Sequence, residues 1–322
     1  MNTMLKKLMQ SRAVRRFLYA MLLVAIVAAA SGCSASRSAF SGTEGKLKVT
    51  ATIGMITDIV RNVGGDRVEA IGLMKSGVDP HLYKATKGDI DKLTDADVVF
   101  YNGLHLEGKM ASILEKLGRK KPTVAVSRNI PESALRDMGD GSDAHDPHIW
   151  FDVRNWMSAT EAVRDELIRL DGANAEKYRA NADAYLAKLR ELHEETKAKI
   201  AQIPEKGRVL VTAHDAFGYF GEAYGIRVMG LQGISTASEA GLKDVSQLRD
   251  FLVENRIKAV FVESSVPKKT IQAVVSGAKE KGHIVQIGGE LFSDAMGEEG
   301  TAEGTYIGMV RHNVDTIVGA LK

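Results

Sequence analysis

Short apolar stretches alternate with segments of helical spacing along most of the chain. Residues 47–53 (LKVTATI) alternate apolar and polar side chains, which predicts a strand, and residues 55–63 have helical spacing that ends at Gly64-Gly65. Further strands are predicted at residues 68–74, 98–101, 209–212, 228–231, 259–263 and 283–287, and helices at 87–94, 216–224, 243–255, 268–281 and 306–321. Strands that alternate with helices predict an α/β fold with parallel sheets.

A tract without predicted strands, residues 155–203, separates the two βα regions. One apolar stripe with spacings of three and four runs through it, formed by Tyr178, Ala182, Tyr185, Leu189 and Leu192. A helix of about thirty residues would be about 45 Å long. We therefore expect two α/β lobes, residues 46–171 and 205–322, joined by a single long backbone helix within residues 172–204.

The N-terminus has the layout of a secretory signal. A basic segment precedes the apolar residues 17–30, a run shorter than the roughly 20 residues that a membrane-spanning helix needs. The small residues 30–32 are followed by Cys33, the single cysteine of the chain, and this arrangement resembles a bacterial lipobox. We expect residues 1–32 to be a lipoprotein signal peptide, Cys33 to carry lipid, and residues 33–45 to form a flexible tether. A plain signal peptide is the alternative.

The composition of the chain argues against several classes of function. The chain has 322 residues, of which 44% are hydrophobic and 26% charged, and its net charge is +2. These values are typical of a soluble globular protein, and the balanced charge gives no support for nucleic-acid binding. The sequence has no GxGxxG after a strand, no P-loop and no GxSxG, so nucleotide-dependent and serine-hydrolase chemistries lack their usual motifs.

Three of the eight histidines occur in turn-like contexts beside α/β elements: His81 in VDPHLY, His148 in DPHIW and His214 in TAHD. His214 follows an apolar strand, and ligands of open parallel sheets bind beyond the carboxyl ends of the strands. Asp-Pro before the other two restricts the backbone, and imidazole is the commonest metal ligand. We interpret the other five as exposed or capping residues: His105, His145, His193, His283 and His312.

Several long segments resemble the metal-binding receptor lipoproteins of bacterial zinc and manganese ABC transporters, the TroA-like solute-binding proteins. They are GVDPHLYKAT, DPHIWFDV, VTAHDAFGYF, LQGISTASEAG, VFVESSVPKK and QIGGELFSDAMGEEGTAEGTYIGM. The resemblance covers almost everything after the tether and implies two α/β lobes bridged by one long helix. It also implies the metal ligands His81, His148, His214 and Asp294. Asp294 alone would read as an exposed loop acid.

The implied cargo is one divalent ion, Zn²⁺ or Mn²⁺, captured between the lobes and delivered to an ABC transporter permease. The protein would be an extracytoplasmic monomer, lipid-anchored through Cys33 in the periplasm or at the cell surface. It would not be an enzyme, because four protein ligands leave little room for the water that a catalytic zinc keeps. A zinc-dependent hydrolase and a surface adhesin are the alternatives. We expect Glu263 either to orient a ligand imidazole or to form a structural ion pair, and Trp150 and Phe217 to belong to the apolar shell of the site.

Overall fold

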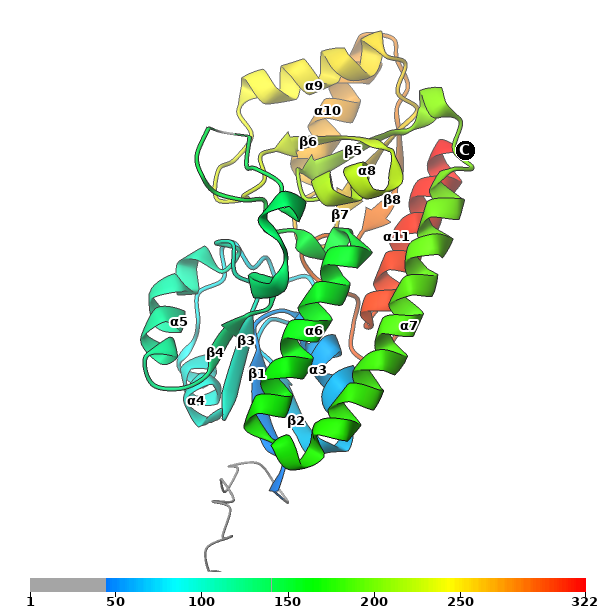
Figure 1. Ribbon diagram of the computed structural model, residues 1–322. Helices are drawn as coiled ribbons and strands as arrows, with labels where there is room; N and C mark the ends of the chain where they lie inside the picture. The colour runs from blue at the N-terminus through cyan, green and yellow to red at the C-terminus, as the bar shows by residue number, and fades with distance from the viewer. Residues whose placement is uncertain (1–44, 140) are drawn as a thin grey trace, which may run out of the picture. The chain divides into compact units, whose positions relative to one another are not determined.

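The computed structural model describes residues 45–139 and 141–322, which belong to one compact unit. The first lobe carries a sheet of four parallel strands in the order β2-β1-β3-β4 (Figure 1). Its strands are β1 (Leu47–Ala51), β2 (Val68–Gly72), β3 (Val98–Tyr101) and β4 (Thr123–Ala125). The strand expected at residues 68–74 thus ends two residues earlier, at Gly72.

The helices of the first lobe are α3 (Gly54–Gly64), α4 (Lys87–Asp95) and α5 (Ala111–Gly118). Helix α4 begins with a capping box, in which Thr86 accepts the backbone N–H of Asp89 and the Asp89 carboxylate accepts that of Thr86. The sequence patterns did not predict α5 or β4. They are short, at eight and three residues, so neither repeats a period often enough to stand out.

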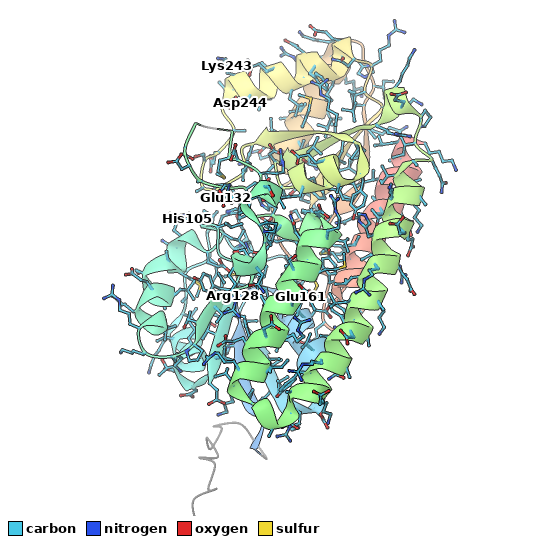
Figure 2. The ribbon with its side chains drawn as sticks, in the orientation of Figure 1. His105, Arg128, Glu132, Glu161, Lys243 and Asp244 are labelled. Carbon is cyan, nitrogen blue, oxygen red and sulfur yellow. The ribbon has the colours of Figure 1, made fainter. Side chains whose placement is uncertain are left out.

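The tract between the sheets contains two helices, α6 (Val153–Leu170) and α7 (Ala175–Ile200), which pack together. The turn between them contains Asp171, which accepts hydrogen bonds from Asn174 and Tyr178. All five members of the predicted stripe on α7 are buried, as its spacing indicated. With 26 residues, α7 is about 39 Å long. Arg128 lies against α6, where it contacts Glu166 and the carbonyl oxygen of Ala162 (Figure 2).

The second lobe has two parallel strand pairs that lie side by side. β5 (Val209–His214) pairs with β6 (Arg227–Gln232), and β7 (Ala259–Glu263) pairs with β8 (Gln286–Leu291). The helices are α8 (Gly218–Tyr224), α9 (Leu242–Glu254), α10 (Lys269–Glu280) and α11 (Tyr306–Leu321), the last of which packs against both α7 and β8. The fold class of two α/β lobes with parallel sheets and a long connecting helix is confirmed.

One strand was misplaced by the sequence pattern. A strand was expected at residues 283–287, but β8 runs from Gln286 to Leu291 and passes through Gly288 and Gly289. His283 instead lies in the preceding turn, where its Nε2 contacts the carbonyl oxygen of Ile257. The close approach of α11 explains the glycines, since a Cβ at Gly288 would lie 2.7 Å from the side chain of Ala320. Glycine has a low strand propensity, so the sequence pattern placed the strand on the apolar residues that precede Gly288.

An apolar core runs without a break from the first sheet through α6, α7 and α11 to Phe261 and Leu291 of the second lobe. A second core fills the space between the outer helices α9 and α10 and the strands of the second lobe. The lobe limits at residues 46–171, 172–204 and 205–322 stay a prediction. The predicted signal peptide and Cys33 lie outside the described residues, as does all of the tether except Gly45. Among the residues that are described, no helix is long and apolar enough to cross a membrane.

Candidate metal centre

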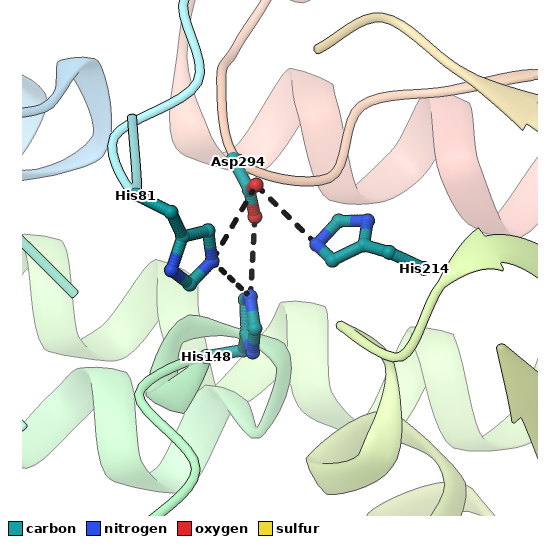
Figure 3. Close-up of side chains that lie close together, drawn as sticks. All are labelled: His81, His148, His214 and Asp294. Carbon is teal, nitrogen blue, oxygen red and sulfur yellow. Dashed lines mark hydrogen bonds and ion pairs between the residues drawn. The ribbon is translucent and has the colours of Figure 1, made fainter. Parts of the chain in front are cut away.

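Four side chains from distant parts of the chain meet between the lobes (Figure 3). His81 lies in the loop after β2, and His148 lies directly before the short 3₁₀ turn Ile149–Phe151. His214 is the last residue of β5, and Asp294 lies in the loop that follows β8. Each offers one ligand atom, and these atoms all lie within 4.8 Å of one another. The structure thus brings together all four residues that the resemblance selected.

Three separations among these atoms match those of a small metal site, and a fourth is longer. The Nε2 atoms of His81 and His148 are 3.3 Å apart. Asp294 Oδ1 lies 3.3 Å from His148 Nε2, and Asp294 Oδ2 lies 3.3 Å from His214 Nε2 and 3.8 Å from His81 Nε2. A tetrahedral ion with bonds of 2.0–2.1 Å has ligand atoms about 3.3–3.4 Å apart. The four side chains could therefore hold one metal ion.

The centre is closed to solvent and contains polar atoms without hydrogen-bond partners. His148 and His214 are fully buried, and His81 and Asp294 are only 5% and 1% exposed. Both carboxylate oxygens of Asp294 and Nε2 of His214 lack a hydrogen-bond partner. Buried polar atoms are nearly always satisfied, so a group of orphans that face one point indicates a missing partner. A cation at that point would supply it.

Trp150 and Phe217, the two residues expected in the apolar shell, are both fully buried, and Trp150 lies directly against an imidazole. The Trp150 ring meets the ring of His148 edge-on, with centroids 5.3 Å apart. Its indole N–H donates to the carbonyl oxygen of Ser293, the residue before Asp294. Phe217 packs against Phe151, with ring centroids 4.2 Å apart. These contacts keep water away from the centre and tie the loop of Asp294 to the first lobe.

Two carboxylates contact the Nδ1 atoms of His148 and His214, on the side of each ring that faces away from the centre. Glu263, the last residue of β7, accepts the backbone N–H of His214 at 2.9 Å and contacts its Nδ1, a geometry that fits the first of the two expected roles for Glu263. Asp146 Oδ1 lies 2.7 Å from Nδ1 of His148. A carboxylate on Nδ1 fixes the ring and leaves Nε2 free to bind a metal. The Nε2 atoms accordingly face the centre.

The role of Asp146 was missed at the sequence level, although a signal was present. Asp-Pro-His occurs twice, at residues 79–81 and 146–148. In both turns the aspartate Oδ1 accepts the backbone N–H of the histidine two residues later, at 2.8 Å for His81 and 3.0 Å for His148. The proline between them has no N–H to compete. The repeated tripeptide is therefore a device that positions histidine.

The charges of the centre are strongly coupled. Burial lowers the pKa of His81 to about 4. Burial also disfavours the charged form of His148, but Asp146 and Asp294 outweigh it and raise the pKa to about 9. The pKa of His214 is raised in the same way by Glu263 and Asp294 against the effect of burial. Burial would raise the pKa of Asp294, but His214 and His148 hold it well below its usual range.

The remaining five histidines do not join a metal-type cluster among the described residues. The expectation of exposure is correct for His105, which lies on the surface of the first lobe (Figure 2). The others are half-buried and not exposed; of the two expected roles, His283 and His312 fit the second, since each contacts a backbone carbonyl oxygen. His145 contacts Glu132 at 2.7 Å, His193 contacts Tyr224, His283 contacts the Ile257 carbonyl, and His312 contacts the Glu290 carbonyl.

Two parallel-sheet lobes around a buried cluster of three histidines and one aspartate define a metal-binding protein of the two-lobed class. Residues 49–320 match the family model described as "Zinc-uptake complex component A periplasmic". The chain is 52% identical over 309 residues to the manganese-binding lipoprotein MntA of Bacillus subtilis, covering 96% of this chain and 100% of that protein.

Two further relatives are also named as metal-binding or metal-transport proteins. The zinc-binding protein TroA of Treponema pallidum is 48% identical over 281 residues, covering 87% of this chain and 91% of TroA. A solved structure of the periplasmic zinc-binding protein TroA from Treponema pallidum superposes with a TM-score of 0.84, covering 86% of this chain and 99% of that one. The manganese ABC transporter substrate-binding lipoprotein PsaA of Streptococcus anginosus is 32% identical over 305 residues, covering 93% of this chain and 95% of PsaA.

The chain belongs to this family of periplasmic metal-uptake components. The expectation from the sequence motifs, a metal-binding protein of an ABC transporter and not an enzyme, is confirmed by these relatives.

Proposed function

We propose that this protein captures one divalent metal ion outside the cytoplasm and delivers it to the permease of an ABC transporter. The observation that carries the proposal is the convergence of four buried ligand groups between the lobes, with orphaned atoms that face one point. Two of the ligands, His81 and His148, belong to the first lobe, and His214 and Asp294 belong to the second. A bound ion would therefore link the lobes.

The donor set suits a transition metal of borderline softness. Three neutral imidazoles and one carboxylate give the ligands a net charge of −1, and nitrogen with oxygen donors favours zinc and its neighbours over Mg²⁺ or Ca²⁺. The 3.3 Å separations support a compact four-coordinate site. Both oxygens of Asp294 face the imidazoles, so a bidentate carboxylate could enlarge the shell for Mn²⁺. We assign Zn²⁺ and Mn²⁺ as the ions that bind.

A binding role fits this site better than hydrolysis does. A catalytic zinc keeps an open position for water and a nearby general base. Here Trp150 and the other apolar side chains close the centre, and the carboxylates of Asp146 and Glu263 are engaged with Nδ1 atoms rather than facing the centre. The relatives are named as binding proteins and transporter components. A surface adhesin would bind a macromolecule independently of the four ligands.

The N-terminal sequence and the names of the relatives support a location at the membrane. MntA and PsaA are named lipoproteins. We propose that Cys33 of this chain carries lipid, that the mature protein is a monomer tethered to the outer face of the membrane, and that its partner there is the permease. No partner among nucleic acids is proposed.

The test is metal content and metal-dependent stability. Protein purified without added metal and dialysed against a chelator is loaded with Zn²⁺, and the bound metal is counted by mass spectrometry. One ion per chain is expected. At about 100 times Kd, the ion should add about 2.7 kcal/mol to the free energy of unfolding. His214→Ala and Asp294→Ala should lose both the ion and the stabilisation, whereas His283→Gln, whose ring contacts the backbone carbonyl oxygen of Ile257 away from the four ligands, should keep both. Full binding by both ligand variants would contradict the assignment.

A further inference from the structure

The two Asp-Pro-His turns share a second feature, which concerns the other oxygen of each aspartate. Asp79 Oδ2 accepts the hydroxyl of Thr236, a residue of the second lobe, at 2.6 Å. Asp146 Oδ2 accepts from Nη1 of Arg136 at 2.9 Å. In each turn, therefore, one oxygen of the aspartate accepts a hydrogen bond from the histidine. The other oxygen contacts either a residue of the second lobe, Thr236, or Arg136, which itself contacts the second lobe.

Arg136 itself connects the first lobe to α8 of the second. Its Nε donates to Glu222 Oε1 at 2.7 Å, and its backbone N–H donates to the hydroxyl of Tyr219 at 3.0 Å. The Tyr219 hydroxyl in turn donates to the carbonyl oxygen of Asp146 at 2.9 Å. Arg136, Asp146, Tyr219 and Glu222 thus form a closed network of contacts across the lobes, which we call the Arg136 clasp.

The backbone of α8 is shaped to receive this arginine. A Cβ at Gly218 would lie 1.3 Å from Nη1 of Arg136, so only glycine lets the guanidinium approach the start of the helix. The guanidinium also lies 5.7 Å from the centre of the Tyr219 ring. A planar fork with five donors can bind two carboxylates at once, which a lysine ammonium does less well. The side chain of Arg136 is 25% exposed, and that of its partner Asp146 is fully buried.

We propose that Arg136 is a positioning residue that couples contact between the lobes to retention of the metal, an inference that rests on the proposed function. With the lobes in contact, Glu222 and Tyr219 fix Arg136, Arg136 fixes Asp146, and Asp146 fixes both the backbone and the ring of His148. When the lobes move apart, α8 withdraws from Arg136 and the hold on His148 loosens. The ion is then released because His148 is less firmly oriented, although all four ligand residues are still present.

The contact of Thr236 with Asp79 acts in parallel on the backbone of His81. Both histidines of the first lobe are therefore braced by groups of the second. A permease that separates the lobes would weaken two ligands at once. By linkage, a contact that is stronger in the metal-bound state must raise metal affinity by the same free energy by which metal strengthens the contact.

The experiment uses the complete folded chain loaded with Zn²⁺ and measures release into excess chelator. Glu222→Gln is the main variant, since Glu222 is 68% exposed and is not a ligand. Arg136→Lys keeps the charge but loses the fork. Each should accelerate release at least about fivefold, and the double variant should be no faster than Arg136→Lys alone. The thermal midpoint should fall more in the loaded protein than in the metal-free protein.

Glu290→Gln is the matched control, because the Glu290 carboxylate pairs with Lys268 within the second lobe. It should release metal at the wild-type rate. The proposal is overturned if Glu222→Gln releases metal at the wild-type rate, or if its thermal midpoint falls equally with and without metal. Failure of the proposed function is a separate result, since the wild-type chain would then bind no metal at all.

Discussion

Glu263 holds His214 at two points: one carboxylate oxygen accepts the backbone N–H at 2.9 Å, and the other contacts Nδ1 of the ring. The two residues end neighbouring strands, β7 and β5, so the contact also joins the two strand pairs of the second lobe. The imidazole is thereby held in orientation, with Nε2 directed to the candidate metal centre.

Replacement of Glu263 by glutamine should weaken metal binding although no ligand is changed. The amide keeps the shape of the side chain but offers one acceptor oxygen where two are needed, so its NH₂ group must face either the backbone N–H or Nδ1. We expect Kd for Zn²⁺ to rise about 10- to 100-fold. Competition with a fluorescent chelator measures this, with Glu290→Gln as the isosteric control. An unchanged Kd would mean that Glu263 serves only to join the strands.

Metal binding should release about two protons per ion at pH 7.5. The pKa of His148 is raised to about 9 and that of His214 is raised well above its usual range, so we expect both to carry a proton in the metal-free protein at this pH. His81, with a pKa lowered to about 4, carries none. Titration calorimetry in two buffers with different ionisation enthalpies counts the protons. Release of none would show that the imidazoles are already neutral before the ion arrives.

The same shifts predict how the metal-free protein responds to pH. Protons bound by His148 stabilise the fold below the ordinary histidine pKa, and this contribution is lost as the pH rises through about 9. The lowered pKa of His81 acts in the opposite sense, since its stabilisation is present above about 6.5 and is lost as the pH falls through about 4. Thermal melts of the metal-free chain should therefore show lower midpoints at pH 9.5 than at pH 7. Saturating Zn²⁺ should abolish this difference, because neither the metal-bound site nor the unfolded chain holds these protons between pH 7 and pH 9.5.

Zn²⁺ should bind at least as tightly as Mn²⁺. Nitrogen-rich sites follow the order of intrinsic affinity in which Mn²⁺ is the weakest of the first-row divalent ions, and the 3.3 Å separations suit short bonds. Direct competition between the two ions at pH 7.5, read by metal analysis after gel filtration, tests this. A clear preference for Mn²⁺ would show that a bidentate Asp294 expands the coordination shell and that geometry outweighs ligand softness.

Cys33→Ala should release the protein from the membrane. Cys33 follows an apolar run and three small residues, an arrangement that resembles a lipobox, so its loss removes the site of acylation. The variant should lose incorporated palmitate label and move to the soluble fraction, while its metal binding stays intact. Identical fractionation of the wild-type protein and the variant would contradict the anchor.

Regular elements with a clear period could be predicted from the sequence. Helix α11 has the predicted limits, Tyr306–Leu321, because its apolar positions repeat over four turns. Strand β4 has three residues and strand β8 passes through two glycines, so neither shows an alternation that can be recognised. Whether an element could be predicted from the sequence therefore depended on its length and on the regularity of its apolar pattern more than on its burial.

Prediction of the candidate metal centre required information beyond local sequence patterns. Spacing along the chain marks His81, His148 and His214 as residues in similar turns, but it cannot bring them to one point. Asp294 had no local signal and came only from the resemblance. Asp146 had a local signal in the repeated Asp-Pro-His, but the contacts of Arg136 arise from packing between the lobes, since Arg136 meets Glu222 across 86 positions of sequence. Contacts of that range are consequences of topology and leave no local pattern.

The position of Trp150 gives the protein a built-in optical probe. The chain has two tryptophans, and both are fully buried. Trp156 stacks on Tyr306 in the shared core, whereas Trp150 touches the ring of His148 and bonds to the residue before Asp294. Exchange of a proton on His148 for a metal ion changes the charge beside one indole and leaves the other in constant surroundings. Intrinsic fluorescence can therefore follow the filling and emptying of the site in unlabelled protein, with Trp156 as a constant background.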